Sequence, residues 1–216
     1  MKKETQKNLI LSLIYLSTFT VWTILVKYID VKPIGPKGSS IGFATINELV
    51  HNLTDVNMLL YNITDWLGLV PIAFAFGFAV LGLIQWIKRK NLLKVDYDIL
   101  ILGLYYTLVI AVYLLFETVV INYRPVLICG YLEVSYPSST TMLVLTVMPT
   151  AIIQLNDRIK NSAIKISLSS VITLFMIFMV LGRLISGVHW FSDIVGGLLL
   201  SLGLINLYIF ALKLKL

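Results

Sequence analysis

Charged residues are scarce in this sequence. They make up 13% of the 216 residues, against 58% hydrophobic residues, whereas an ordinary soluble domain carries about 25% charged residues. Despite a net charge of +6, a chain with so few charges could not cover its own surface with polar groups in water. The composition therefore excludes a soluble enzyme, a disordered tail and a nucleic-acid-binding domain, and it indicates a membrane protein.

Cysteine and histidine are also rare. Cys129 is the single cysteine, so no intrachain disulfide can form. Two histidines and one cysteine cannot supply the four ligands of a structural zinc site. We therefore expect neither a metal nor another cofactor. The length fits one integral membrane domain over residues 1–216.

Long apolar runs are what the sequence has in abundance. A membrane-spanning helix needs about 20 apolar residues, because about 30 Å of hydrocarbon is crossed at about 1.5 Å per residue. Six runs reach or approach that length, namely residues 9–26, 66–87, 99–121, 139–155, 166–181 and 194–212. None shows the strict alternation of a membrane β-barrel. The sequence therefore predicts an all-α, polytopic bundle of six transmembrane helices.

Lysine and arginine are distributed unevenly between the two sides that six spans define. Twelve of the 17 basic residues fall on the side of both termini, and the other five are Lys27, Lys32, Lys37, Arg124 and Arg183. The positive-inside rule then predicts a cell-membrane protein with both termini in the cytoplasm. A cleaved signal peptide is the competing interpretation of the N-terminus, but its apolar run is long and no small-residue cleavage site follows it.

The longest polar segment, residues 30–65, joins the first two spans. Within it Ile46, Leu49, Val50 and Leu53 recur at helical spacing, which predicts a short amphipathic helix on the outer surface. We expect this helix to pack its apolar side over the bundle. The alternative is that it acts as a lid or a gate for lipid entry.

Unusual polar residues all fall on the outer side of the predicted bundle, in three separate connections. They are Glu117 and Arg124 around the exit of the third span, Ser138, Ser139 and Thr140 at the start of the fourth, and Arg183, His189 and Asp193 between the fifth and sixth. Charged groups at membrane depth are costly and are mostly functional. Their convergence on one face therefore predicts a functional site there.

The residue types in these connections suit a phosphate group. His189 and Asp193 are four residues apart, so on a helix the carboxylate can accept the Nδ1 proton and leave Nε2 free as a nucleophile or base. The planar, permanently charged guanidiniums of Arg124 and Arg183 match phosphate oxygens. Hydroxyl residues at a helix start add backbone N–H donors and a favourable dipole. The pattern predicts a phosphate pocket with a histidine directed into it.

The spacing of these residues resembles a known family. Arg183, His189 and Asp193, with five and three residues between them, resemble the third signature of the type-2 phosphatidic acid phosphatases, which are integral-membrane lipid phosphate phosphatases. The Arg-Pro pair at 124–125 and the Pro-Ser pair at 137–138 resemble parts of the first and second signatures. The resemblance implies that the histidine forms a phosphohistidine, that the aspartate orients it, and that both arginines hold the phosphate without a metal.

The sequence departs from the family pattern at three places. Glu117 stands where the family has a lysine, Ser139 and Thr140 stand where it has glycine and histidine, and Gly182 replaces a serine. In the family that histidine protonates the leaving alkoxide, which a threonine cannot do. His51, the other histidine, and Glu117 are the candidate acids on the outer side. A diphosphate substrate would lessen the need for an acid.

The sequence thus predicts a membrane phosphatase that acts on a lipid phosphate or diphosphate at the outer face, among membrane lipids and without nucleic acid. One alternative is a catalytically impaired protein of the same fold that binds lipid phosphates or serves as a scaffold. The oriented histidine and aspartate favour activity, because a binding protein has no need of them. Another alternative is an anion or lipid transporter, but transporters place polar groups near the membrane midplane, often in repeated halves.

Overall fold

The structure is a computed structural model, and it describes residues 3–214. Within these residues, six helical segments are long and apolar enough to cross a membrane. They are Lys3–Tyr28 (α1), Met58–Leu67 with Leu69–Arg89 (α3 and α4), Tyr97–Thr118 (α5), Ser139–Arg158 (α6), Ser162–Ile185 (α7) and Phe191–Lys213 (α8). The prediction of a six-span helical membrane protein is confirmed.

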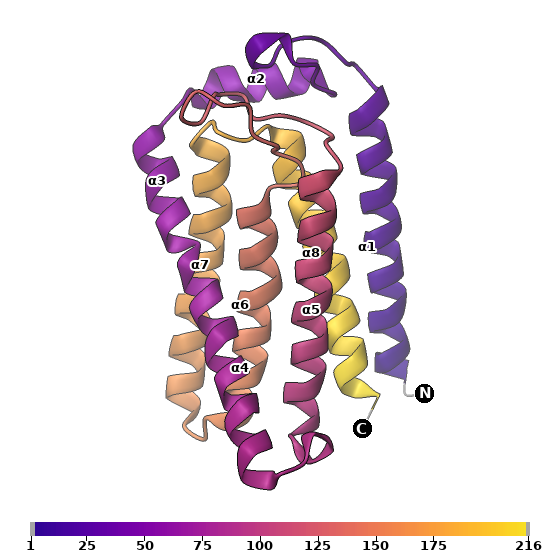
Figure 1. Ribbon diagram of the computed structural model, residues 1–216, viewed down its shortest axis with the longest axis vertical. Coiled ribbons are helices and arrows are strands. Elements are labelled where there is room, and N and C mark those ends of the chain that lie inside the picture. Colours follow the sequence, from indigo (N-terminus) through magenta and orange to yellow (C-terminus); the bar gives the residue numbers. More distant parts are fainter. Residues whose placement is uncertain (1–2, 215–216) are drawn as a thin grey trace.

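The spans run side by side, and both ends of the chain lie at the same end of the bundle (Figure 1). The short 3-10 helix η2 (Leu92–Lys94) closes the turn between α4 and α5 at that end. At the opposite end, which we name the site end, a second 3-10 helix η1 (Pro36–Gly38) precedes α2 (Ala44–Thr54), and α2 lies across the bundle. The connections α5–α6 and α7–α8 reach the same end, so the three groups of candidate residues meet there.

Side-chain caps fix where several of these helices begin. The side chain of Asn57 accepts a hydrogen bond from the backbone of Leu60 at the start of α3, and Asn161 does the same for the first turn of α7. Ser138 caps α6 in the same way. Such caps satisfy N–H groups that a first helical turn leaves without a partner.

The second span begins earlier than predicted. α3 starts at Met58 and α4 continues after Gly68, so the span covers 32 residues and includes the end of the segment predicted to be polar. The polar residues Asn62 and Asp65 interrupt the apolar run there, so nothing in the sequence indicates that the span begins before residue 66. The third span also differs, since α5 ends at Thr118 rather than at residue 121. Asp65 therefore lies on a helix of the bundle and not in a loop.

The amphipathic helix is present as α2, but its predicted orientation is wrong. Leu49 and Leu53 are 59% and 78% exposed, so the apolar stripe faces away from the bundle. The side that carries Ala44 and Asn47 is the buried one: Nδ2 of Asn47 donates to Oγ of Ser192 at 2.9 Å, and the N–H of Ser192 donates to Oδ1 of Asn47 at 3.0 Å. Paired hydrogen bonds to the start of α8 thus decide which side of α2 faces inward.

α8 lies at the centre of the bundle, against α1 and α6. Its glycines permit this close packing, because a Cβ on Gly203 would lie 2.6 Å from Leu16 of α1. Similarly, a Cβ on Gly196 would lie 2.7 Å from the ring of Tyr136, in the connection before α6. The first turns of α6 and α8 are therefore held next to each other at the site end.

Candidate active site

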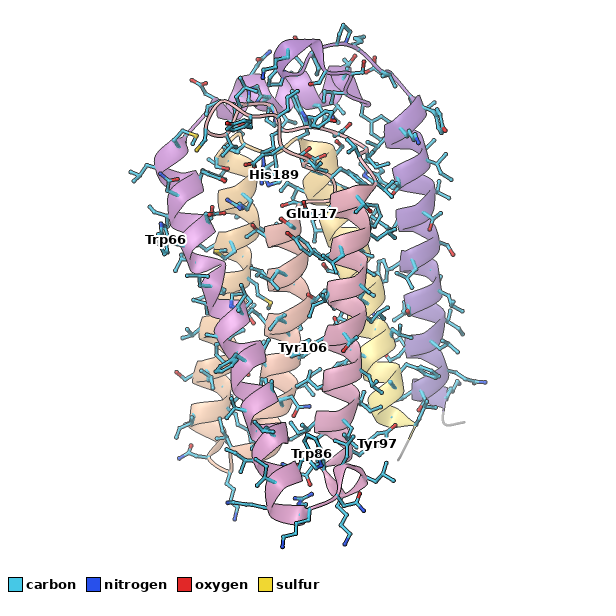
Figure 2. The ribbon with its side chains drawn as sticks, viewed as in Figure 1. Trp66, Trp86, Tyr97, Tyr106, Glu117 and His189 are labelled. Atoms are coloured by element: carbon cyan, nitrogen blue, oxygen red, sulfur yellow. The ribbon has the colours of Figure 1, made fainter. Side chains whose placement is uncertain are left out.

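His189 lies in the short connection between α7 and α8, at the site end of the bundle (Figure 2). This connection depends on Gly187, whose φ is +65° and on which a Cβ would lie 2.0 Å from the carbonyl oxygen of Asp55. Only glycine allows the chain to pass so close to the segment that joins α2 to α3. The His189 side chain is 1% exposed, so its imidazole belongs to the interior of the site.

Arg124 determines which nitrogen of His189 carries the proton. Nη1 of Arg124 lies 3.0 Å from Nε2 of His189. A guanidinium only donates hydrogen bonds, so Nε2 is the acceptor and the neutral imidazole carries its proton on Nδ1. The Nε2 lone pair, which a nucleophilic histidine uses, therefore points at a group suited to bind a phosphate oxygen.

Asp193 lies in the first turn of α8 and is fully buried. Its Oδ2 accepts a hydrogen bond from the backbone N–H of Trp190 at 3.0 Å, and its Oδ1 accepts one from Nδ2 of Asn122 at 3.1 Å. Oδ2 also lies 3.8 Å from Nδ1 of His189, which is longer than a hydrogen bond. Asp193 thus caps α8 and faces the imidazole, and a small approach of the two side chains would join them.

Burial and neighbouring charges keep His189 neutral. Burial lowers the pKa of His189 well below its ordinary value of 6.5, the positive charges of Arg124 and Arg183 lower this pKa further, and the backbone of Ser135 opposes them. The imidazole is therefore uncharged at neutral pH. That is the form in which histidine acts as a nucleophile.

Arg183 lies in the last turn of α7 and has four hydrogen-bond acceptors. Nη2 donates to Oδ1 of Asp65 at 2.9 Å and to Oγ1 of Thr140 at 2.5 Å. Nη1 donates to Oγ1 of Thr64 at 3.3 Å and to the carbonyl oxygen of Tyr61 at 3.4 Å. Its Nε is buried and has no hydrogen-bond partner among residues 3–214. Buried donors rarely lack an acceptor, so this N–H is available to an oxyanion.

The ring of Tyr61 lies against both arginines. Its centroid is 4.9 Å from Cζ of Arg183 and 5.8 Å from Cζ of Arg124, and both distances are within the range of a cation–π interaction. Arg124 also forms an ion pair, with Nε 3.0 Å from Oε2 of Glu133. One aromatic ring and the carboxylates of Asp65 and Glu133 therefore stabilise two buried positive charges close together.

The first residues of α6 differ in what they contact. Ser138 is buried, its Oγ accepts from the N–H of Thr141 at 3.5 Å, and its own N–H donates to the carbonyl oxygen of Asp193 at 3.1 Å. Thr140 instead accepts from Arg183. Ser138 therefore connects α6 to α8, whereas Thr140 belongs to the arginine site.

Ser139 and Glu117 line a different, small cavity whose wall includes Tyr136. Glu117 is exposed and lies beside Tyr113 in the last turns of α5. The structure therefore does not bring Glu117 and Ser139 to the two arginines, although the sequence placed them with the site.

His51 is half-buried on α2 and packs against the ring of Trp190, with 5.5 Å between the ring centroids. Its Nδ1 is buried, and no hydrogen-bond partner for it exists in the described part of the chain, residues 3–214. Burial lowers the pKa of His51 from 6.5, which the charge of Asp55 partly offsets. His51 is thus a neutral residue that packs against Trp190, the residue that follows His189.

The polar residues of the site that were not predicted from the sequence include Asp65, Asn122 and Glu133. Two of them had a detectable signal. Asp65 directly precedes the uncharged run at residue 66, at the site end, and Asn122 lies two residues before Arg124. Glu133 had no such signal, because only the folded connection between α5 and α6 brings it to Arg124, where their backbones also pair.

The described residues, 3–214, contain no group of three or more His, Cys, Asp or Glu side chains placed to hold a metal ion. The positive charge available to an anion at this site comes from the guanidiniums of Arg124 and Arg183, which are both buried. The arrangement suits a tetrahedral oxyanion bound next to a neutral imidazole.

Comparison with known proteins agrees with this description. The model of the PAP2 superfamily matches residues 99–214, more than half of the chain, and the chain belongs to that superfamily. The family resemblance drawn from the signatures is thereby confirmed. The chain is also similar to the crystal structure of a transmembrane PAP2-type phosphatidylglycerolphosphate phosphatase from Bacillus subtilis, with a TM-score of 0.60 and 17% identity over 95% of this chain and 96% of that one. At this identity the match shows a shared fold. No curated protein sequence matches the chain significantly.

Proposed function

We propose that this protein is a metal-independent phosphatase that hydrolyses a lipid phosphate or diphosphate through a phosphohistidine intermediate. The observation that carries the proposal is the 3.0 Å contact between Nη1 of Arg124 and Nε2 of His189. It directs the lone pair of a neutral imidazole at an anion-binding group, inside a membrane protein of the PAP2 superfamily.

The contacts of the site suggest the order of events. An entering phosphate replaces His189 as acceptor of the Arg124 N–H and accepts the free Nε–H of Arg183. Nε2 of His189 then attacks phosphorus while the bond to the leaving oxygen breaks. Asp193 stabilises the imidazolium that forms, and the guanidiniums offset the charge on the equatorial oxygens. Water finally hydrolyses the phosphohistidine and releases inorganic phosphate.

The side of the membrane follows from charge. Twelve of the 17 basic residues belong to the end that carries the termini, so the positive-inside rule supports cytoplasmic termini and a site end at the outer face. Lipid headgroups of the outer leaflet lie at that level. Candidate substrates are phosphatidate, phosphatidylglycerol phosphate and an isoprenoid carrier diphosphate.

The test is phosphate release by the purified protein from these three lipids. We expect wild type to turn over at least one, and we expect His189→Ala to lower kcat/KM by about 10³-fold or more. His51→Ala is the matched control and keeps activity, because its ring contacts Trp190 rather than the arginines. Trapped phosphoenzyme should be labile to acid and stable to base, as a phosphohistidine is. Lipid binding without turnover by wild type would instead identify a binding protein of the same fold.

A further inference from the structure

We propose that Asp65 is the acid that protonates the leaving oxygen, an inference that rests on the phosphatase function proposed above. The family resemblance gives this role to a histidine, and this chain has Thr140 at that position. A threonine hydroxyl is far too weak an acid for the task. The proton must therefore come from another side chain that reaches the same place.

Asp65 reaches that place from a different helix. One nitrogen of Arg183, Nη2, donates both to Oγ1 of Thr140 at 2.5 Å and to Oδ1 of Asp65 at 2.9 Å. The two oxygen atoms are therefore neighbours, although their residues lie on α6 and α3. The carboxyl group of Asp65 and the hydroxyl group of Thr140 thus share one donor of Arg183.

Asp65 and His189 are bound to different members of the arginine pair. His189 contacts Arg124 and Asp65 contacts Arg183, while the ring of Tyr61 lies against both guanidiniums. A phosphate that bridges the guanidiniums would meet the imidazole beside one and the carboxyl group beside the other. In-line displacement needs this separation, because the leaving oxygen departs opposite the attacking atom.

The exposure of Asp65 also fits a leaving group that carries lipid chains. The Asp65 side chain is 56% exposed, whereas that of Arg183 is 1% exposed. The next residue on α3, Trp66, is 74% exposed and points away from the bundle (Figure 2). Lipid chains remain outside the packed helices, so the leaving oxygen lies between the buried arginines and the surface. Asp65 stands at that boundary.

The other carboxylates and the second histidine are less well placed. Glu133 is paired with Arg124, the arginine that already contacts the nucleophile. Glu117 lines the separate cavity behind Tyr136, and His51 packs against Trp190. Among the acidic and histidine side chains that residues 3–214 place at the site end, Asp65 is the one joined to Arg183.

The proton and electron pairs balance in both steps. A phosphate that enters as the monoanion brings one proton, which it can pass to the carboxylate of Asp65 while both groups accept from Arg183. As Nε2 of His189 bonds to phosphorus, the P–O bond breaks, and the leaving oxygen takes the proton of the Asp65 carboxyl group. A water molecule then gives a proton to the Asp65 carboxylate as its oxygen attacks phosphorus, and the N–P electron pair returns to His189.

The test compares two lipids that share a dioctanoylglycerol tail. The leaving group of phosphatidate is the diacylglycerol alkoxide, which needs a proton. The leaving group of diacylglycerol diphosphate is a phosphomonoester, which needs little help from an acid. We expect Asp65→Asn to lower kcat about 10²- to 10⁴-fold for phosphatidate and much less for the diphosphate, because the asparagine oxygen still accepts from Arg183. Asp65→Glu should recover part of the phosphatidate activity. Glu117→Gln is the matched control and should leave the ratio of the two rates unchanged.

Two results would overturn the assignment. The first is an unchanged ratio of the two rates in folded Asp65→Asn protein, whether both rates fall equally or neither falls, because Asp65 would then at most position Arg183. The second is a selective loss of phosphatidate activity in Glu117→Gln. Wild-type protein that turns over neither lipid contradicts the phosphatase proposal itself, and the role of Asp65 falls with it.

Discussion

The side chains of Arg124 and His189 are joined by a 3.0 Å hydrogen bond whose direction is fixed by their chemistry. The guanidinium donates, so the imidazole nitrogen that accepts is unprotonated. This hydrogen bond occupies the lone pair of Nε2. Under the phosphatase mechanism proposed above, an incoming phosphate would have to separate the two groups, so that substrate binding would also free His189 for attack.

The neutral state of His189 gives a measurable dependence of stability on pH. Its pKa in the folded protein lies well below 6.5, so below about pH 6.5 the unfolded chain binds a proton that the folded protein does not, and stability falls with the pH. We expect the melting temperature in detergent to drop less between about pH 7 and pH 5 for His189→Asn than for wild type. His51→Asn is the control, because it keeps the contribution of His189 to the pH dependence of stability. Parallel curves for His189→Asn and wild type would contradict the prediction.

The two arginines should differ in their importance for folding. Arg183→Met leaves Thr64, Thr140 and a backbone carbonyl without their donor, so we expect the free energy of unfolding to fall by about 1–3 kcal/mol. Arg124→Met should cost less, because it leaves a single buried acceptor, Nε2 of His189, without its donor, and its other partner Glu133 is 42% exposed and can turn to water. Denaturant unfolding in the same detergent measures both values. Equal losses would show that the burial of Arg183 has no energetic consequence.

Much of the fold follows from the sequence, because hydropathy determines where the spans occur. Successive spans run in opposite directions, so every second connection lies at the same end of the bundle. Arg124, Arg183 and His189 converge for that reason alone. The order of the spans does not reveal contacts between side chains, so the pairing of Asp65 with Arg183 could not be predicted. The orientation of α2 could not be predicted either. An apolar stripe can face protein or lipid, and the spacing of its residues is the same in both cases.

Asn122 should support the histidine through Asp193. Asn122→Ala removes the donor to Oδ1 of Asp193, so we expect the free energy of unfolding to fall by about 1–3 kcal/mol and kcat to decrease. Asn122→Asp should be worse, because it places a second carboxylate against a buried one. Phosphate release and thermal unfolding report the two effects. Asn206→Ala is the control, since that exposed side chain donates to the carbonyl of its own helix; an equal effect there would contradict the role of Asn122.

Substitutions at two glycines with positive φ can distinguish the cost of backbone strain from the cost of a steric collision. Gly130→Ala meets nothing within 4 Å and should cost about 1–2 kcal/mol for its left-handed conformation alone. Gly187→Ala adds a collision with the carbonyl oxygen of Asp55 at 2.0 Å, so it should be more destabilising and should also lower activity by displacing His189. Similar losses of stability and activity in the two variants would show that the connection adapts without cost.

The orientation of the protein can be measured by labelling. Cys129 is exposed in the connection at the site end, so a membrane-impermeant thiol reagent added to intact cells should modify it. In a Cys129→Ser background, Lys90→Cys lies at the other end of the bundle and should react only after the cells are opened. The reverse pattern would place the site in the cytoplasm.

The outward leucines of α2 mean that this helix is held by two different surroundings at once. Asn47 joins it to Ser192, three residues after His189, while Leu49 and Leu53 face away from the bundle, where a bilayer would surround them with acyl chains. Under the proposed function, a change in lipid packing around α2 would therefore act on the segment next to His189. The bilayer would then influence the activity of the protein as well as hold it.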